Sequence, residues 1–406
     1  MSTPAATLVI HNISELATCD AARGVTPGVL THAALAASGR LITFVGSETE
    51  LHSLERGPDC MEIDAGGCAV VPGFVDSHSH LVWLGERSYE YELRAQGASY
   101  EDIAAAGGGI RSTVTATQSG AVSDLVEGAH DRASAMLRLG TTTVEVKSGY
   151  GLTLAAELRE LEAIRELHLL ADVPDLVATY LPMHATPPNE RGEFLREVND
   201  EGLRQVRGLA EFVDAFCDTG AYSVVECEAF LTTAATMGFG LKLHAEQRSH
   251  TGAAQLAARL GAVSADHLEF ANDADLAALA RAGTVAVLLP GAALTLGGPP
   301  PPGRRALDAG ATVAIATDCN PGTCYTESMP LIMSLAVALA GLTAGEALCA
   351  ATRGGAQALR QRDRGVIRVG RRCDLVITGS AHWLDLCYHL GGDVVAQVVR
   401  EGVVVA

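Results

Sequence analysis

The chain has 406 residues, of which 48% are hydrophobic, and its formal net charge is −19. This length suffices for one barrel-sized core and a smaller second unit. The acidic balance disfavours sequence-independent binding to nucleic acid or to an anionic membrane surface, so we expect neither as a partner.

The cellular compartment is indicated by three features. The first ten residues lack a basic cluster followed by an apolar stretch. The nearest candidate for a membrane span, residues 331–342, is too short to cross a bilayer. The ten cysteines are scattered and none lies in a Cys-x-x-Cys pair, which is typical of reduced thiols. We therefore expect a cytoplasmic protein.

Short β-branched runs separated by turn residues occupy both ends of the chain, within residues 1–70 and 366–406. Such runs are typical of short strands. Neither end has enough of them to bury a sheet face alone. We therefore expect a small composite β-sandwich domain assembled from both termini, separate from a domain over residues 71–365.

Between the two ends, apolar runs alternate with alanine- and leucine-rich segments at helical spacing. Parallel strands buried on both faces give such runs, so the pattern predicts an α/β fold, a (β/α)₈ TIM-like barrel. The gap over residues 76–141 is long, and insertions at the C-terminal ends of barrel strands commonly build the active site. Eight strands are expected, at residues 70–75, 142–147, 177–181, 212–217, 240–244, 262–267, 284–289 and 312–317.

Four potential metal ligands stand at the ends of these strands. His78 and His80 follow the first strand two residues apart, so both imidazoles can point to the same side. His244 ends the fifth strand and Asp318 follows the eighth. A single histidine usually satisfies only a local hydrogen bond. Four donors at one barrel mouth instead predict one Zn²⁺ or one iron ion (Fe²⁺ or Fe³⁺) per chain, since imidazole and carboxylate suit these metals.

Other polar residues near these motifs have two interpretations each. His267 ends the sixth strand, and it is either a fifth ligand or a group that orients water or polarises a substrate carbonyl. Lys147 could carry a carbamate that bridges two metals, but the fourth strand offers no lysine, so a single ion is expected. Cys319 and Cys324 flank the Asp318 motif and are interpreted as packing residues.

These motifs resemble the amidohydrolase superfamily and, within it, the imidazolonepropionase family. The superfamily pattern is Pro-Gly-x-x-Asp-x-His-x-His at 72–80. The narrower resemblance is carried by Lys-Ser-Gly-Tyr-Gly at 147–151 and Thr-Asp-Cys-Asn-Pro-Gly at 317–322, and it runs through most of the chain. It implies hydrolysis of the cyclic amide of 4-imidazolone-5-propanoate, a carboxylate-bearing substrate, to N-formimidoyl-L-glutamate in histidine degradation.

The resemblance also implies roles for individual residues. Arg87 would receive the substrate carboxylate, which a planar guanidinium can bind with two hydrogen bonds. Pro182-Met183 precedes His184 where the family has Gly-Ala, and Gln118 stands where an arginine is expected, so substrate identity is affected more than reaction class. The implied substrate-binding residues are Arg87, Tyr150, His184, Gln247, Asn320, Gly322 and Thr323, and the implied catalytic residues are Asp318, His267, His184 and Gln247.

In the expected mechanism, Asp318 accepts a proton from an activated water and passes it to the departing ring nitrogen. His267, together with His184, would stabilise the oxyanion. One alternative is a superfamily deaminase, or a hydrolase of a related carboxylate-bearing cyclic amide. Ring deaminases place a glutamate three residues after the strand-5 histidine, where this chain has Gln247. A non-catalytic scaffold protein is the other alternative, and the intact ligand set argues against it. Barrels of this kind often form homodimers, which we expect here.

Overall fold

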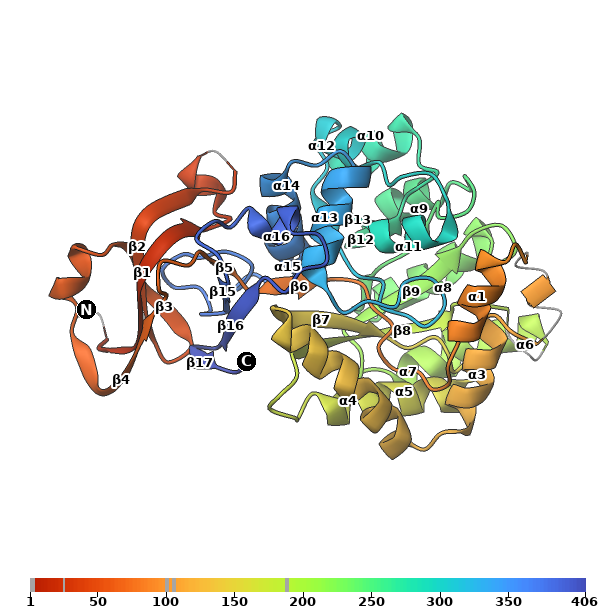
Figure 1. Cartoon of the computed structure of the whole chain (residues 1–406). Helices are drawn as coiled ribbons and strands as arrows, with labels where there is room; N and C mark the ends of the chain where they lie inside the picture. The colour runs from red at the N-terminus through yellow and green to blue at the C-terminus, as the bar shows by residue number, and fades with distance from the viewer. Residues whose placement is uncertain (1–3, 25, 99–101, 104–106, 187–189) are drawn as a thin grey trace.

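Strands from both ends of the chain form one mixed sheet beside a barrel (Figure 1). The computed structural model describes residues 4–24, 26–98, 102–103, 107–186 and 190–406. The expectation that strands from both termini assemble beside the barrel is confirmed, and they do so as one mixed sheet. The strands of this terminal sheet are β1 (Ala6–Ala17), β2 (Val29–Ser38), β3 (Leu41–Ser47), β4 (Arg56–Asp64), β5 (Val70–Pro72), β15 (Leu375–Thr378), β16 (Val395–Arg400) and β17 (Val403–Val404).

Hydrogen bonds connect the terminal sheet in the order β17-β16-β15-β5-β1-β2-β3, with β4 also paired to β1. The strands thus form one continuous sheet. Leu16, Leu35 and Leu375 come from both ends of the chain and share one buried core. The sheet reaches a stable size because strands from both ends of the chain pair within it.

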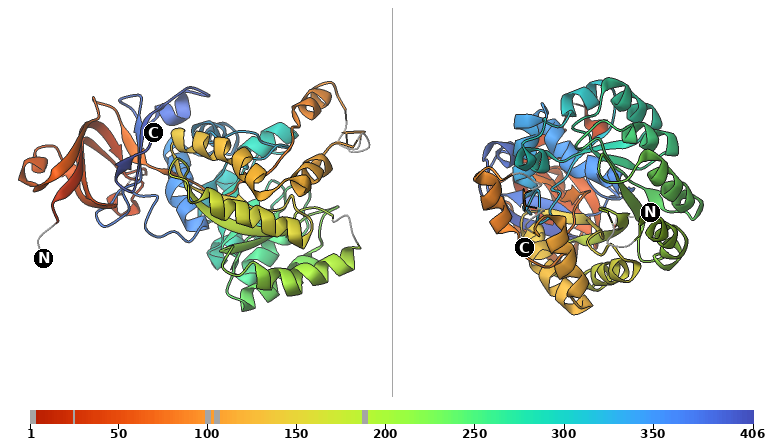
Figure 2. Two further views of the ribbon diagram at one scale, coloured as in Figure 1. Left: turned by 90° about the horizontal axis from the view of Figure 1, so that it is seen from below. Right: turned by 90° about the vertical axis from the view of Figure 1, so that its right-hand side faces the viewer.

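The barrel strands are all parallel to their neighbours, and helices surround them (Figure 2, right). The predicted TIM-like barrel is confirmed. Its order is β14-β13-β12-β11-β9-β8-β7-β6, with β10 also paired to β9. These strands are β6 (Phe74–Asp76), β7 (Thr141–Lys147), β8 (Asp175–Met183), β9 (Phe212–Cys217), β10 (Gly240–Leu241), β11 (His244–Ala245), β12 (Ser264–His267), β13 (Val285–Leu288) and β14 (Val313–Ile315).

Six of the described α-helices begin at a residue whose side chain caps the helix. Ser223 and Glu226 form a capping box at the start of α8, and Asn272 accepts hydrogen bonds from Ala274 N and Asp275 N at the start of α10. The α-helices are α1 (Ser88–Ala95), α3 (Ile110–Ser119), α4 (Val122–Arg138), α5 (Leu154–Leu167), α6 (Arg191–Glu197), α7 (Leu203–Gln205), α8 (Val224–Thr236), α9 (Ala253–Leu260), α10 (Asp273–Ala282), α11 (Pro290–Leu296), α12 (Gly303–Asp308), α13 (Met329–Leu339), α14 (Ala344–Cys349), α15 (Gly355–Ala358) and α16 (Asp385–Tyr388). Within the described part of the chain, no helix is both long and apolar enough to span a bilayer.

The first predicted strand, residues 70–75, is divided between the two sheets. Val70–Pro72 pairs with β15, whereas Phe74–Asp76 pairs with β7. Gly73 stands at the break, where a Cβ would lie 2.4 Å from Thr142 Oγ1. Only glycine allows the chain to pass this close to β7 as it leaves the terminal sheet.

The barrel closes between its first and last strands, directly at the metal-ligand motifs. Asp318 N donates to His78 O at 3.0 Å, and His80 N donates to Cys319 O at 3.0 Å. Asp76 Oδ2 also accepts a 2.5 Å hydrogen bond from the hydroxyl of Thr317. This closure brings the motifs at residues 76–80 and 317–322 side by side.

The long first insertion contains α1, α3 and α4, and α4 packs on the outside of the barrel against α5 and β7. Arg94 of α1 donates to Gly322 O at 3.0 Å, so this helix contacts the loop after β14. Cys319 and Cys324 are both buried, in agreement with their interpretation as packing residues.

Candidate active site

Four buried donors meet at the C-terminal mouth of the barrel. The carboxylate Oδ1 of Asp318 lies 3.6 Å from His78 Nε2 and 3.5 Å from His80 Nε2. The ring centroid of His244 lies 4.5 Å from that of His78 and 5.6 Å from that of His80. All four side chains are at most 4% exposed. The structure therefore brings together the four residues that the sequence suggested as ligands.

The donor set fits a zinc or iron ion. Two donors that bind one ion at about 2.1 Å with tetrahedral geometry lie about 3.4 Å apart, close to both Asp318 distances. His78 Nε2 and His244 Nε2 are buried without a hydrogen-bond partner among the described residues. Buried polar nitrogens rarely lack a partner, and an ion would satisfy both. Two overlapping groups, His78 with His244 and His267, and His80 with His184 and His244, also have ligand atoms close together.

Two carboxylates, one on β9 and one on β12, orient the histidines. His78 Nδ1 lies 2.7 Å from Asp266 Oδ2, and His244 Nδ1 lies 2.9 Å from Asp214 Oδ2. An ionised carboxylate only accepts hydrogen bonds, so Nδ1 carries the proton in the His78 ring, and the nearby Asp214 carboxylate favours the same tautomer of His244. This tautomer leaves the lone pair of each Nε2 facing the proposed ion. Sequence reasoning assigned neither aspartate a role, although Asp214 is an acidic residue inside an otherwise apolar strand and Asp266 directly precedes His267.

The only two lysines of the chain are fully buried beneath this layer. Lys147 Nζ lies 2.9 Å from Glu145 Oε1 and 2.9 Å from Asp214 Oδ2. Lys242 Nζ donates to Glu145 Oε2 at 2.9 Å and to Ser77 O at 2.9 Å. Burial opposes the charge, but Asp214, Glu145 and Asp266 together raise the pKa of Lys147. The amine of Lys147 is thus paired with two carboxylates beneath the histidines.

Asp318 is fixed by the loop that follows it. Its backbone is left-handed, with φ of 50°, and its Oδ2 lies 3.4 Å from the Thr323 hydroxyl that donates to it. The Asn320 amide donates to Asp318 O at 2.6 Å, and its Oδ1 accepts from Gly322 N and Thr323 N. The side chain of Asn320 therefore holds the loop itself. Burial raises the pKa of Asp318, which suits a carboxyl that takes up and releases a proton.

His184 and His267 differ in protonation. His184 Nδ1 donates to Gly149 O at 3.0 Å, so a neutral ring has no proton on Nε2. Burial, together with the neighbouring His244, lowers the pKa of His184 to about 3. For His267, burial lowers the pKa, but the Glu269 and Asp318 carboxylates outweigh this and raise it overall. His184 therefore offers an acceptor at neutral pH, whereas His267 is the better cation.

Arg87 lies beside the loop after β14. Its Nε and Nη2 both donate to Glu90 Oε2, at 3.0 and 2.8 Å. Nη1 has no hydrogen bond to any described residue and lies against Gly322, where a Cβ would come within 2.5 Å of it. Tyr150 is also buried, with its ring centroid 5.9 Å from that of His80. Burial raises the pKa of its phenol, which therefore keeps its proton.

Three further polar residues, Gln118, Gln247 and Glu246, bear on substrate identity and on the deaminase alternative. Gln118 donates to Gly151 O at 2.7 Å, so it supports the turn that carries Tyr150. Gln247 is half-buried, two residues after the end of β11. Glu246 is buried, and its carboxylate accepts from Thr251 N, Gly252 N and Ala254 N at the start of α9. Glu246 is therefore occupied as a cap at the start of α9.

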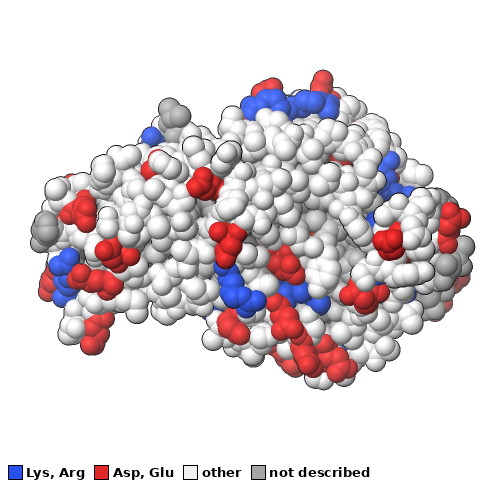
Figure 3. All heavy atoms as spheres, in the orientation of Figure 1, with Lys and Arg blue, Asp and Glu red and all other residues white. Residues whose placement is uncertain are grey.

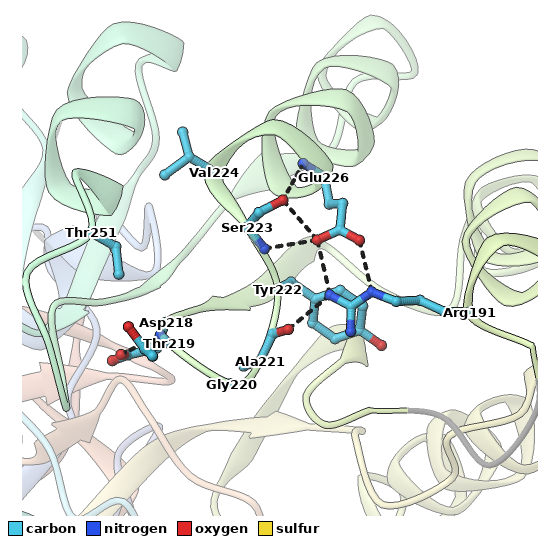
Figure 4. Close-up of a pocket in the computed structure, with 10 residues that line it drawn as sticks. All are labelled: Arg191, Asp218, Thr219, Gly220, Ala221, Tyr222, Ser223, Val224, Glu226 and Thr251. Atoms are coloured by element: carbon cyan, nitrogen blue, oxygen red, sulfur yellow. Dashed lines mark hydrogen bonds and ion pairs between the residues drawn. The ribbon is translucent and has the colours of Figure 1, made fainter.

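A separate pocket of about 460 Å³ lies by the loop after β9 (Figure 4). Arg191 lies over the Tyr222 ring at 4.4 Å and binds both oxygens of Glu226, at 2.8 and 2.9 Å. Its charge is therefore already compensated. Arg87 is also paired with a carboxylate, that of Glu90, but it lies against Gly322 in the loop that carries Asp318.

Comparison with known proteins agrees with this geometry. Residues 69–405 match the amidohydrolase family model. An adenosine deaminase from Xanthomonas campestris, solved with bound zinc, superposes with a TM-score of 0.72 at 21% identity, covering 99% of this chain and 93% of its own. A triazine hydrolase variant gives a TM-score of 0.73 at 20% identity, with coverage of 98% and 94%. These two structures establish the fold alone. The chain belongs to the amidohydrolase family.

Within that family, the similarity is to imidazolonepropionases over nearly the whole length. The enzyme of Rubrobacter xylanophilus is 43% identical over 407 residues, covering 98% of each chain. The enzyme of Symbiobacterium thermophilum is 46% identical over 387 residues, covering 92% of this chain and 90% of its own. The expected family is thus confirmed, and imidazolonepropionase activity in histidine degradation is the activity that this homology supports.

Proposed function

We propose that this chain hydrolyses the ring amide of 4-imidazolone-5-propanoate to N-formimidoyl-L-glutamate, with one zinc or iron ion held by His78, His80, His244 and Asp318. The observation that carries the proposal is the convergence of these donors in a chain that is 43% identical to an imidazolonepropionase over 98% of its length. When bound, such an ion would act as a Lewis acid that makes water a nucleophile near neutral pH.

Asp318 is the proposed proton carrier. Its Oδ1 faces the histidines, which leaves Oδ2, held by the Thr323 hydroxyl, to take the proton of the attacking water. The same carboxyl then delivers this proton to the ring nitrogen as the amide bond breaks. Its raised pKa reduces the cost of holding the proton between the two steps.

His267 and His184 take different proposed roles. His267 donates a hydrogen bond to the oxyanion that forms at the ring carbonyl, because Glu269 and Asp318 favour its charged form. His184 donates a hydrogen bond from Nδ1 to Gly149 O, so its Nε2 accepts a hydrogen bond from a ring N–H of the substrate. Of the two histidines expected at the oxyanion, only His267 keeps this role in the proposal.

The substrate carboxylate would lie between Arg87 and the loop after β14. Arg87 Nη1 is free to donate, while Glu90 fixes the other side of the guanidinium. Tyr150 and Thr323 would line the same region, because the Tyr150 ring lies near that of His80 and the Thr323 hydroxyl donates to Asp318. Gln247, at the half-buried edge of β11, is the proposed contact to the outer side of the ring. Substrate contacts of Asn320 and Gly322 would come through the loop backbone.

We further propose that the enzyme works in the cytoplasm as a homodimer. All ten cysteines are free, which suits a reducing compartment. Sedimentation of the purified protein would test the dimer, and an unchanged monomer mass across micromolar concentrations would contradict it.

The decisive experiment combines metal analysis with an assay for loss of imidazolone absorbance. We expect one zinc or iron per chain, turnover of 4-imidazolone-5-propanoate, and an Arg87→Met variant that loses substrate binding by about 2 kcal/mol, as for a severed charged hydrogen bond. An Arg281→Met variant on the exposed end of α10 is the control. Ammonia release from a ring amine, without turnover of the imidazolone, would instead establish the deaminase. An unchanged KM for Arg87→Met would remove the role assigned to this residue.

A further inference from the structure

A strongly basic pocket lies where the chain leaves the last barrel helix and returns to the terminal sheet. Its volume is about 600 Å³, and no carboxylate lines it among the described residues. We call it the arginine pocket. Its charged lining residues are Arg353, Arg360, Arg362, Arg364, Arg368 and Arg371.

This concentration of positive charge contrasts with the rest of the molecule. The chain has 48 acidic residues against 29 lysines and arginines. On the face shown in Figure 3, acidic side chains are scattered over both the terminal sheet and the barrel. Six arginines around one pocket therefore stand out from an acidic background, and they repel one another unless a counter-charge is present.

Only part of this charge is compensated within the protein. Arg364 binds Asp175 and Asp363, and Arg368 binds Asp20. The other four arginines have no carboxylate within 4.0 Å in the described part of the chain. Arg353 donates to Cys19 O and Arg371 to Arg362 O, so both are held in place by backbone carbonyls. The guanidinium groups of Arg360 and Arg362 are exposed and make no hydrogen bond to a described residue.

The arginine pocket lies at the opposite end of the barrel from the proposed metal site. Arg364 donates to the hydroxyl of Thr143, near the start of β7, whereas the proposed ligands follow the C-terminal ends of their strands. Arg353 reaches Cys19 in the terminal part of the chain. A ligand here would contact neither Asp318 nor Arg87. It would instead join the terminal sheet to the N-terminal end of the barrel.

We propose that the arginine pocket binds a small anion that carries several negatively charged oxygens, either a polyphosphate or a polycarboxylate. Guanidinium groups bind both chemistries through paired N–H donors. The volume lies within the usual range for small-ligand sites. Two arginines are anchored by backbone carbonyls and two are free at the rim, so the site has a fixed base and adaptable donors. Binding relieves the mutual repulsion of the uncompensated cations and therefore stabilises the fold.

The test is calorimetric titration of the metal-loaded enzyme with tripolyphosphate and, separately, with tricarballylate at low ionic strength. We expect saturable binding of one anion per chain. An Arg360→Gln/Arg362→Gln variant should bind at least about tenfold more weakly, since two charge-assisted contacts are lost. These two side chains have no partner whose loss would disturb the fold. The stronger of the two probes identifies the ligand as phosphate-bearing or carboxylate-bearing.

The matched control is Arg196→Gln/Arg281→Gln, which removes the same charge from exposed positions on α6 and α10. It should bind as the native protein does. Binding of the probes to the active-site ion would persist unchanged in the Arg360→Gln/Arg362→Gln variant. Equal affinity in all three proteins, or no saturable binding in the native enzyme, would overturn the proposal.

Discussion

The imidazole of His78 and the carboxylate of Asp266 face each other across the barrel, with 2.7 Å between Nδ1 and Oδ2 and neither side chain exposed. His78 follows β6 and Asp266 lies on β12, and the two residues are 188 positions apart in the chain. Their contact fixes the direction in which His78 presents Nε2. Asp214 does the same for His244, so two of the four proposed ligands are oriented by a carboxylate.

We therefore expect Asp266→Asn to weaken metal binding by about 10- to 100-fold, because the amide is a weaker acceptor for the ligand's Nδ1 proton. Competition with a chromogenic chelator would measure the dissociation constant directly. Asp131→Asn, at a side chain that is 95% exposed, is the control and should bind metal normally. Native metal affinity in Asp266→Asn would show that His78 is oriented by other contacts.

The two buried lysines give a second prediction. Lys147→Met leaves Glu145 and Asp214 without the cation that lies 2.9 Å from each, so we expect a loss of about 3–5 kcal/mol in the free energy of unfolding. Urea denaturation of the metal-loaded protein would measure it.

A chemical control tests the same burial without substitution. Lys147 and Lys242 are the only lysines in the sequence, and both side chains are fully buried. An amine-reactive reagent should leave both unmodified in the native protein and modify both after denaturation. Rapid labelling of either lysine in the native state would contradict the structure.

The sequence predicted the barrel and the four donors because both depend on local rules. Near-continuous apolar runs indicate parallel strands, and the ends of parallel strands meet at one mouth of a barrel. His78, His244 and Asp318 could thus be brought together without knowing any contact between them.

The orienting network could not be predicted in the same way. Glu145 and Lys147 lie two residues apart on one strand, so their side chains share a face. Their partners Lys242 and Asp214 come from other parts of the chain, and only the curvature of the barrel brings the four side chains together. The division of residues 70–75 at Gly73 likewise depends on Thr142 of the neighbouring strand. Such contacts are set by tertiary packing rather than by local pattern.

Gly322 provides a third prediction, at the proposed substrate site. A Cβ there would lie 2.5 Å from Arg87 Nη1, so Gly322→Ala must displace the guanidinium. We expect KM for 4-imidazolone-5-propanoate to rise by about tenfold with little change in kcat, because uniform binding rather than transition-state contact is lost. Gly298→Ala is the matched control, because an added Cβ at Gly298 would meet no described atom within 4 Å. A fall in kcat alone would place Arg87 in the chemical step instead.

The ion pair of Arg191 and Glu226 gives a prediction about pH. Hydrogen bonding to Arg191 lowers the pKa of Glu226 to about 2, below its ordinary value of 4.5. The stabilisation is therefore complete above pH 4.5 and is lost as the pH falls from about 4.5 to about 2. Both side chains are partly exposed, so we expect Glu226→Gln to cost only about 1 kcal/mol at pH 7, and the difference from the native protein to shrink steadily below pH 4.5.

Glu228→Gln, in the exposed pair with Arg259 near the same helix, should change stability by less than about 0.5 kcal/mol at either pH. Urea denaturation at pH 7 and pH 3 would compare the three proteins. A cost for Glu226→Gln that is the same at both pH values would show that the ionised carboxylate is not what stabilises the start of α8.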